Sequence, residues 1–283
     1  MKNNIGFMQG RLSPMIGGNI QAFPKSHWRE EFAAAQGIGL HLLEWTLDHD
    51  GLELNPLMTE AGRAEIRNLL ARHDMEIPSI TGDCFMQAPF YKASGAEAKE
   101  LKQELRNVIA AAARIAARLI VVPLVDNGAI ENADQHGRLL DGLGEITEKL
   151  KKFDMTIAFE SDYGPQELAG FIGELPEGAF TINYDTGNSA ALGFDPIEEF
   201  AAYGRRVANV HIKDRVLGGT TVPLGQGDTD FANIFSCLTA LNYDGNLILQ
   251  TARTQSDEHA EVLDSYRSMV VDWCEGAQRT DAT

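Results

Sequence analysis

Thr156-Ile-Ala-Phe-Glu160 opens the stretch of sequence that decides the fold, and this stretch extends to Arg253. Residues that favour turns follow this run and three more apolar runs that also end on one polar residue. The three are Thr181-Ile-Asn-Tyr-Asp185, Ala208-Asn-Val-His211 and Leu247-Ile-Leu-Gln250. If the runs are neighbouring parallel strands, their last side chains converge at one end of a sheet. Oxygen and nitrogen donors gathered in this way predict a metal site.

Eight strand candidates are spread along the whole chain. They begin near residues 4, 41, 76, 119, 155, 180, 207 and 245, far enough apart for a helical crossover between each pair. Eight such units predict an α/β fold, the (β/α)8 TIM barrel, with residues 1–283 as a single domain. The alternative is a doubly wound open sheet. However, Met8-Gln9-Gly10-Arg11 lacks the glycine-rich phosphate turn that usually follows the first strand of that fold.

Helical patterns fill the intervals between the strands. Apolar spacing and capping residues predict helices over residues 26–37, 59–73, 101–115, 133–153, 165–172, 196–203, 231–241 and 257–274. The polar residues 276–283 are predicted to form a disordered tail. No low-complexity linker divides the chain, which agrees with one domain.

The composition argues against several classes of partner. Among 283 residues, 41 are acidic and 24 basic, and the formal net charge of -17 would repel a nucleic-acid backbone. We expect neither a signal peptide nor a membrane span, because no stretch has the required apolar length and flanking charges. Three cysteines without metal-type spacing indicate reduced thiols and a cytoplasmic location. A homo-oligomer is left open.

Alternation along the strands separates polar from apolar side chains. If Glu160, Asp185 and His211 face the barrel axis, then Asn183 and Asn209 face it too. The side chains expected to face the helices are apolar: Ile157, Phe159, Ile182, Tyr184 and Val210.

The four strand-end residues suit one divalent ion. Two carboxylates and an imidazole bind Mn²⁺, Mg²⁺, Co²⁺ or Zn²⁺, with manganese favoured, and Gln250 would add an amide oxygen. Taken alone, each residue would more often cap a helix or make a structural hydrogen bond. Their common position at four successive strand ends favours the metal site.

Several motifs along the chain stand out: Gly6-Phe-Met-Gln-Gly-Arg-Leu-Ser-Pro14, Phe159-Glu-Ser161, Tyr184-Asp-Thr-Gly-Asn188, Val210-His-Ile-Lys-Asp-Arg215 and Pro223-Leu-Gly-Gln-Gly-Asp228. Together they resemble the xylose isomerase-like barrel superfamily, the sugar phosphate isomerase/epimerase group. The resemblance covers essentially the whole chain, and it implies a TIM barrel that carries the site of a metal-dependent sugar enzyme.

The resemblance implies that Glu160, Asp185, His211 and Gln250 are the metal ligands. In the epimerases of this group, the first and last ligands are both glutamates, which exchange protons with opposite faces of a substrate carbon. An amide cannot act as a base near neutral pH, so Gln250 leaves Glu160 as the only general base of the motif. Asn188 stands where many members carry a substrate-binding histidine.

Other strand ends supply further candidates for substrate binding or for a second acid or base. Lys213 would act in catalysis by stabilising an enediolate oxygen, and Arg215 would hold a phosphate or carboxylate. A surface salt bridge or a turn is the alternative role for each of these residues. The remaining candidates are Gln9, Arg11, Glu44, Asp83 and Asp126.

We therefore predict an isomerase or epimerase that acts on a keto-sugar or sugar phosphate through an enediolate, with Glu160 as the base. The same metal and base would also serve a dehydratase or lyase on a keto-polyol or dehydroshikimate-like substrate. A third alternative is a catalytically impaired sugar-binding protein of the same fold. A nuclease of this fold is disfavoured by the acidic composition.

Overall fold

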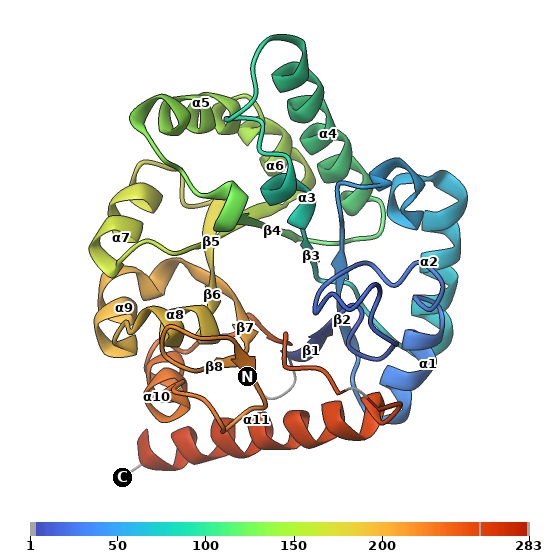
Figure 1. The fold of residues 1–283 in the computed structure, drawn as a ribbon, viewed down its shortest axis with the longest axis vertical. Coiled ribbons are helices and arrows are strands. Elements are labelled where there is room, and N and C mark those ends of the chain that lie inside the picture. Colours follow the sequence, from blue (N-terminus) through green and yellow to red (C-terminus); the bar gives the residue numbers. More distant parts are fainter. Residues whose placement is uncertain (1–3, 255, 282–283) are drawn as a thin grey trace.

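Each predicted strand pairs in parallel with two neighbours, and the eight strands close into a barrel in the order β1-β10-β7-β6-β5-β4-β3-β2 (Figure 1). This computed structural model describes residues 4–254 and 256–281. The predicted TIM barrel is confirmed and the doubly wound sheet is excluded. The strands are β1 (Ile5–Met8), β2 (Leu42–Thr46), β3 (Ser79–Thr81), β4 (Leu119–Leu124), β5 (Thr156–Ser161), β6 (Phe180–Asp185), β7 (Val207–Ile212) and β10 (Asn246–Leu249).

Helices form a ring outside the strands (Figure 1). The ring contains α1 (Glu30–Gly37), α2 (Glu60–His73), α4 (Gly95–Ala113), α5 (Ala133–Gly144), α6 (Thr147–Phe153), α7 (Pro165–Gly173), α9 (Pro196–Tyr203), α10 (Phe231–Ala240) and α11 (His259–Asp281). Short 3-10 helices are η2 (Leu52–Leu54), η3 (Pro56–Met58), η4 (Asp126–Gly128) and η5 (Gly204–Arg206). Within the described residues, no helix is long and apolar enough to cross a membrane.

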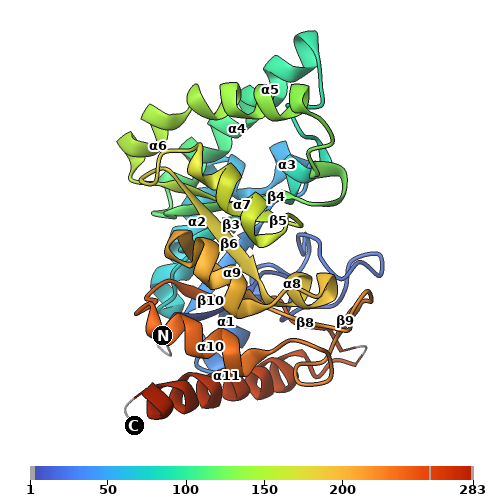
Figure 2. The ribbon, with the colours of Figure 1, turned by 90° about the vertical axis from the view of Figure 1, so that its left-hand side faces the viewer.

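Three short elements gather at one end of the barrel. They are α3 (Asp83–Gln87), α8 (Thr186–Leu192) and the antiparallel hairpin of β8 (Asp214–Arg215) and β9 (Thr221–Val222). Figure 2 shows all three on the same side, beyond the carboxyl ends of the strands. The sequence predicted only turns at these places. They surround the barrel mouth, where a TIM barrel carries its functional residues.

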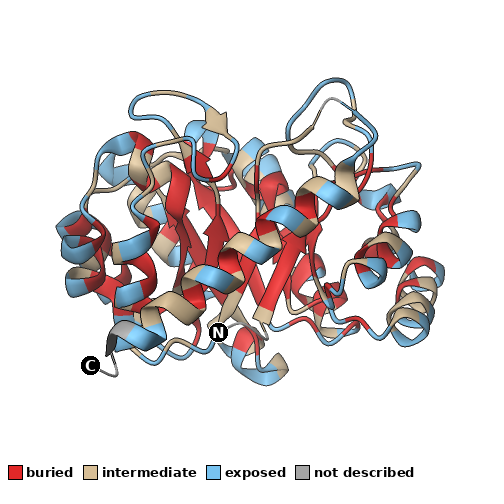
Figure 3. Cartoon of the chain, turned by 90° about the horizontal axis from the view of Figure 1, so that it is seen from below, coloured by how far each residue is buried: buried red, intermediate tan, exposed pale blue. Residues whose placement is uncertain are grey.

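The predicted alternation of the strand side chains is confirmed. Outward residues pack in the layer between strands and helices, where Phe159 contacts the rings of Phe171 and Phe180. Inside the barrel, Leu119, Val121 and Ala158 form a small apolar cluster. Figure 3 shows the result, with buried strands at the centre and helices whose outer faces are exposed.

Several helix predictions were wrong in extent, because α1 begins at Glu30 rather than at residue 26 and α4 begins at Gly95 rather than at residue 101. The helix predicted over 133–153 is divided into α5 and α6, and the buried Ile146 lies between them. Gly142 and Gly144 weaken helix continuity there. The tail predicted to be disordered from 276 is helical to Asp281, because Ala277 still packs against the core. Residues 282–283 lie outside the described residues.

The loop after β1 is held by a buried carboxylate. Glu31 on α1 is fully buried and accepts hydrogen bonds from the backbone amides of Gly10 and Leu12 and from the Ser13 hydroxyl, at 2.9–3.1 Å. Burial raises the pKa of Glu31 to about 7, although these hydrogen bonds oppose the rise. This carboxylate fixes the loop that carries Arg11 to the mouth.

We predict that Glu31→Gln lowers the free energy of unfolding by about 1–3 kcal/mol, because the amide NH₂ turns a donor towards backbone donors. Urea denaturation of both proteins would measure the loss. Glu30→Gln, which changes the exposed neighbour, is the matched control and should be near neutral. Equal stability of the two variants would contradict the role of Glu31.

Candidate metal centre and sugar site

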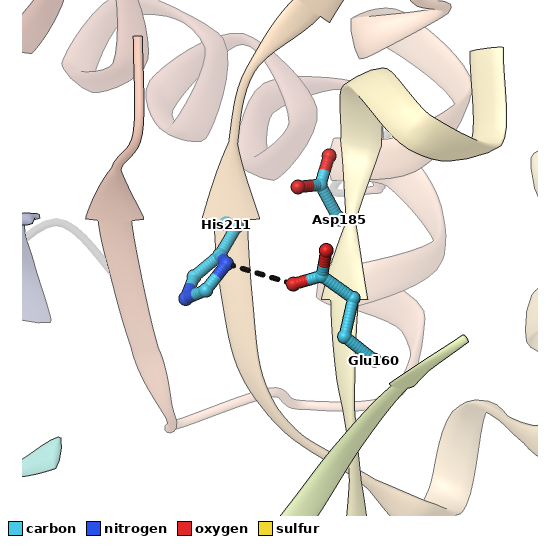
Figure 4. A group of neighbouring side chains, drawn as sticks. All are labelled: Glu160, Asp185 and His211. Atoms are coloured by element: carbon cyan, nitrogen blue, oxygen red, sulfur yellow. Dashed lines mark hydrogen bonds and ion pairs between the residues drawn. The ribbon is translucent and has the colours of Figure 1, made fainter. Parts of the chain in front are cut away.

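Three predicted ligands meet at the mouth of the barrel. One ligand atom from each of Glu160, Asp185 and His211 lies within 4.8 Å of the others, and all three residues are buried. Figure 4 shows their side chains pointing towards one another from β5, β6 and β7. Parallel pairing brings them together, because Asp185 is the register partner of His211 and β5 lies on the other side of β6.

Asp185 serves two partners at once. Its Oδ1 accepts from the backbone amides of Gly187 and Asn188 at 3.0 and 2.9 Å, so it caps α8. Its Oδ2 lies 2.7 Å from Nζ of Lys213. The capping role that was the alternative for a strand-end carboxylate is therefore present, and the residue also belongs to the ligand group.

His211 is fixed from below by Glu44. Nε2 of His211 donates to Oε1 of Glu44 at 2.7 Å, and Nδ1 lies 3.2 Å from Oε2 of Glu160. Burial disfavours the imidazolium, but the two carboxylates outweigh it and raise the pKa of His211 to about 10. Because Nε2 is bound to Glu44, the ring nitrogen that faces the other candidate ligands is Nδ1.

Glu44 is itself saturated by donors inside the barrel. Its carboxylate accepts from Oγ of Ser79 at 2.6 Å, from the Thr81 hydroxyl, and from Nδ2 of Asn209 at 3.0 Å. Burial favours the neutral acid, but His211 and the hydroxyls outweigh it and lower the pKa of Glu44. Glu44 thus holds the histidine as an anion, an arrangement that orients metal-binding histidines in proteins.

Two amides orient the Glu160 carboxylate. Nδ2 of Asn183 donates to Oε2 at 2.8 Å, and Nδ2 of Asn188 donates to Oε1 at 2.8 Å. The Asn188 carbonyl in turn accepts from Nη1 of Arg215 at 2.8 Å. Asn183 was predicted only to face inward, and its contact with Glu160 depends on packing that the sequence does not express.

A cavity of about 240 Å³ lies above the ligand group. Three predicted site residues do not line it: Gln9 and Glu44 are fully buried within the barrel, and Asp185 is buried beside Glu160 and His211. The predicted site residues that line it are Arg11, Asp83, Asp126, Glu160, Asn188, His211, Lys213, Arg215 and Gln250.

Gln250 brings an unsatisfied oxygen to this cavity. Its Oε1 is buried and has no hydrogen-bond partner among the described residues. A buried acceptor left unpaired costs about 1–3 kcal/mol, so the oxygen calls for a donor or a cation. The donor set therefore fits a divalent ion, with Gln250 beside the Glu160, Asp185 and His211 group.

On the side of the mouth formed by the β1 loop, the Gln21 amide connects Arg11 to Asp83. Arg11 donates to the carbonyls of Thr251 and Ile20 and to Oε1 of Gln21 at 3.0–3.2 Å. Nε2 of Gln21 donates to Oδ2 of Asp83 at 3.0 Å. Burial and the nearby Arg253 lower the pKa of Arg11 to about 9. Gln21 was not predicted as a site residue, because its contact with Asp83 joins segments that are far apart in the chain.

The glycine-rich segment after β9 is not free to hold a phosphate. Oδ2 of Asp214 accepts from the backbone amides of Gly225 and Gly227 at 2.8 and 2.9 Å, and Oδ1 accepts from the Thr229 amide. These amides close a tight loop around an internal carboxylate.

The exposed Asp162, which follows Glu160 in the turn after β5, also lines the cavity and was not predicted.

The chain resembles known proteins over most of its length. The family described as "Xylose isomerase-like TIM barrel" matches residues 32–269. L-ribulose-5-phosphate 3-epimerase UlaE of Shigella flexneri is 26% identical over 245 residues, which cover 83% of this chain and 86% of the relative.

Two solved structures share the fold at low sequence identity. D-allulose 3-epimerase from Methylomonas sp., in complex with D-allulose, superposes with a TM-score of 0.74 at 15% identity, covering 95% of this chain and 96% of that one. The IOLI protein with a bound zinc atom has a TM-score of 0.75 at 14% identity, covering 97% and 99%.

We predict that Glu44→Gln lowers the free energy of unfolding by about 1–3 kcal/mol, because an amide NH₂ then faces the Asn209, Ser79 and Thr81 donors. Thermal and urea unfolding measure this loss, and nitrogen NMR of the His211 ring reports its protonation. Glu76→Gln at an exposed position is the matched control. An unchanged ring and unchanged stability would contradict the role assigned to Glu44.

Proposed function

Because the chain belongs to the xylose isomerase-like TIM barrel family, we propose that it is a sugar isomerase or epimerase that moves a proton at a carbon next to a carbonyl. The observation that carries the proposal is the buried Glu160, Asp185 and His211 group at the barrel mouth. The curated relative, an L-ribulose-5-phosphate 3-epimerase, supports the reaction class. The cytoplasmic location and any homo-oligomer stay predictions.

A divalent ion, manganese by our proposal, would be held by Glu160, Asp185, His211 and Gln250. When bound, such an ion polarises a substrate carbonyl and lowers the cost of an enediolate. The unpaired Gln250 oxygen and the inward-facing Nδ1 of His211 support this assignment. The chain's own contribution is to hold these donors rigidly, through Glu44 and Asn183.

Glu160 is the base in this proposal. Its carboxylate lines the cavity, and Asn183 and Asn188 fix both oxygens. Lys213 lies at the same wall and pairs with Asp185, so its ammonium would sit beside the negative charge that develops on the substrate oxygen. Hydrogen bonds from sugar hydroxyls would go to Asp83 and Asp126, which follow β3 and β4 and also line the cavity.

The cavity favours a small substrate. Its volume of about 240 Å³ is below the ~300–1,000 Å³ of sites for drug-sized ligands. Arg11 and Arg215 line it and offer cationic groups to a phosphate, but both already donate to internal acceptors. Keto-sugars with and without a phosphate are therefore the substrates to compare.

Gln250 favours a second candidate, a dehydratase or lyase. Position 250 offers no second base, and an enediolate that is not reprotonated can expel a β-hydroxyl instead. Mass spectrometry would identify this reaction by a product that is lighter than the keto-sugar by one water molecule. A protein that binds these sugars and turns none over would instead be a sugar-binding protein.

We predict that Glu160→Gln lowers turnover by about 10²–10⁴-fold, the usual contribution of a general base. The assay follows D-allulose and L-ribulose 5-phosphate with Mn²⁺ by chromatography. Glu167→Gln, at an exposed position on α7, is the matched control and should retain activity. Undiminished activity in Glu160→Gln would contradict the assignment of the base.

We also predict that Mn²⁺ affinity rises with pH. The metal-free His211, with its pKa raised to about 10, must lose a proton before Nδ1 can bind an ion. The apparent dissociation constant should therefore fall by up to about tenfold for each pH unit between about 6 and 8. Calorimetry in buffers of different ionisation enthalpy would count the released proton. Affinity that does not change with pH would contradict this linkage.

A further inference from the structure

An epimerase needs proton transfer on both faces of one carbon, and this site supplies one evident base. This inference rests on the proposed function, which requires a second group that transfers a proton on the face of the carbon opposite Glu160. Gln250 lacks a proton to exchange near neutral pH. The remaining ionisable groups at the cavity wall are Arg11, Asp83, Asp126, Asp162, Lys213 and Arg215.

The three cations are already engaged. Lys213 is paired with Asp185 at 2.7 Å, and Arg215 donates to the carbonyls of Gly219 and Asn188. Arg11 donates from all three guanidinium nitrogens. These contacts fix them as binding or electrostatic groups rather than as acids.

Two of the three carboxylates are also poorly suited. Asp162 is exposed and follows Glu160 on the same strand end, so it does not serve the opposite face. Asp126 is exposed to solvent in the turn after β4. Asp83 is different, because its side chain is buried at the cavity wall.

Asp83 lies across the mouth from the ligands. The barrel order puts the ligand strands β5, β6, β7 and β10 side by side, and β3, which leads into Asp83, is four strands from β7 in either direction. A substrate that rests on the ligand group therefore has Asp83 on the facing wall. Asp83 thus faces His211 across the mouth, and because β4 separates β3 from β5, Asp83 and Glu160 reach the cavity from different directions.

The contacts of Asp83 leave one oxygen for a substrate. Oδ2 accepts from Gln21 at 3.0 Å, and Oδ1 has no hydrogen-bond partner among the described residues. Burial raises the pKa of Asp83 to about 7; the Gln21 contact and His211 oppose the rise, and the charges of Asp48 and Glu160 add to it. Both the acid and the carboxylate are thus accessible near neutral pH.

We propose that Asp83 is the second proton-transfer residue, which replaces the glutamate that position 250 lacks. In one direction, Glu160 removes the proton from the carbon, and the C–H electron pair moves towards the carbonyl oxygen. The Asp83 carboxyl then gives its proton to the other face of the same carbon and becomes a carboxylate. Proton exchange with water through the mouth restores both groups, and in the reverse direction their roles are exchanged.

Exchange in heavy water separates the two groups. The holoenzyme with Mn²⁺ is incubated in D₂O with D-allulose and with L-ribulose 5-phosphate, and NMR follows both deuterium in recovered substrate and the epimer formed. For Asp83→Asn we expect epimer formation to fall by about 10²-fold or more, while deuterium still enters the recovered substrate within about tenfold of the parent rate. Glu160→Gln should lose both.

The asparagine can still accept from Gln21, so the variant should fold, and thermal unfolding checks this. Asp141→Asn, at an exposed position on α5, controls for the lost charge. Parent-like epimerisation by Asp83→Asn, or loss of exchange together with epimerisation, would overturn the role of Asp83. A parent protein that neither exchanges nor epimerises either sugar would instead contradict the proposed function and, with it, this role.

Discussion

The contact between Glu44 and His211 is the interaction on which the site depends. It lies inside the barrel, with both side chains at most 1% exposed. A buried carboxylate is costly unless donors surround it, and here two hydroxyls, an amide and the imidazole do so. The interior of the barrel is therefore a hydrogen-bonded support for the mouth, and removal of one member leaves the others unpaired.

This support also determines how charge is distributed at the mouth. With Gln250 in place of an acid, the ligand group holds two carboxylates, Glu160 and Asp185, and the neighbouring cation Lys213 offsets part of their charge. Glu44 contributes a further negative charge behind the histidine. The electric field in the cavity therefore comes both from the residues at the mouth and from Glu44 behind them. Low-dielectric surroundings screen these charges little.

Much of this architecture was predictable because it is written in short-range patterns. Strand positions follow from apolar runs and turn residues, and the inward position of Asn183 follows from alternation. The carboxyl ends of parallel strands must lie together, so Glu160, Asp185 and His211 could be grouped without coordinates. Helix α8 was not predicted, because Thr186-Gly187-Asn188 has the composition of a turn. In the structure, the Asp185 cap makes this segment the start of a helix.

The sequence by itself determined the barrel, the strands that carry the candidate ligands and the absence of a second base at position 250, because each follows from local periodicity or residue chemistry. Only the tertiary structure decided how far each polar side chain is buried and which partners it contacts. Glu44 proved to be buried behind His211, and Asp83 to be sheltered on the facing wall with one free oxygen. Such roles depend on burial and on partners distant in the chain, such as Gln21, and no local pattern encodes them.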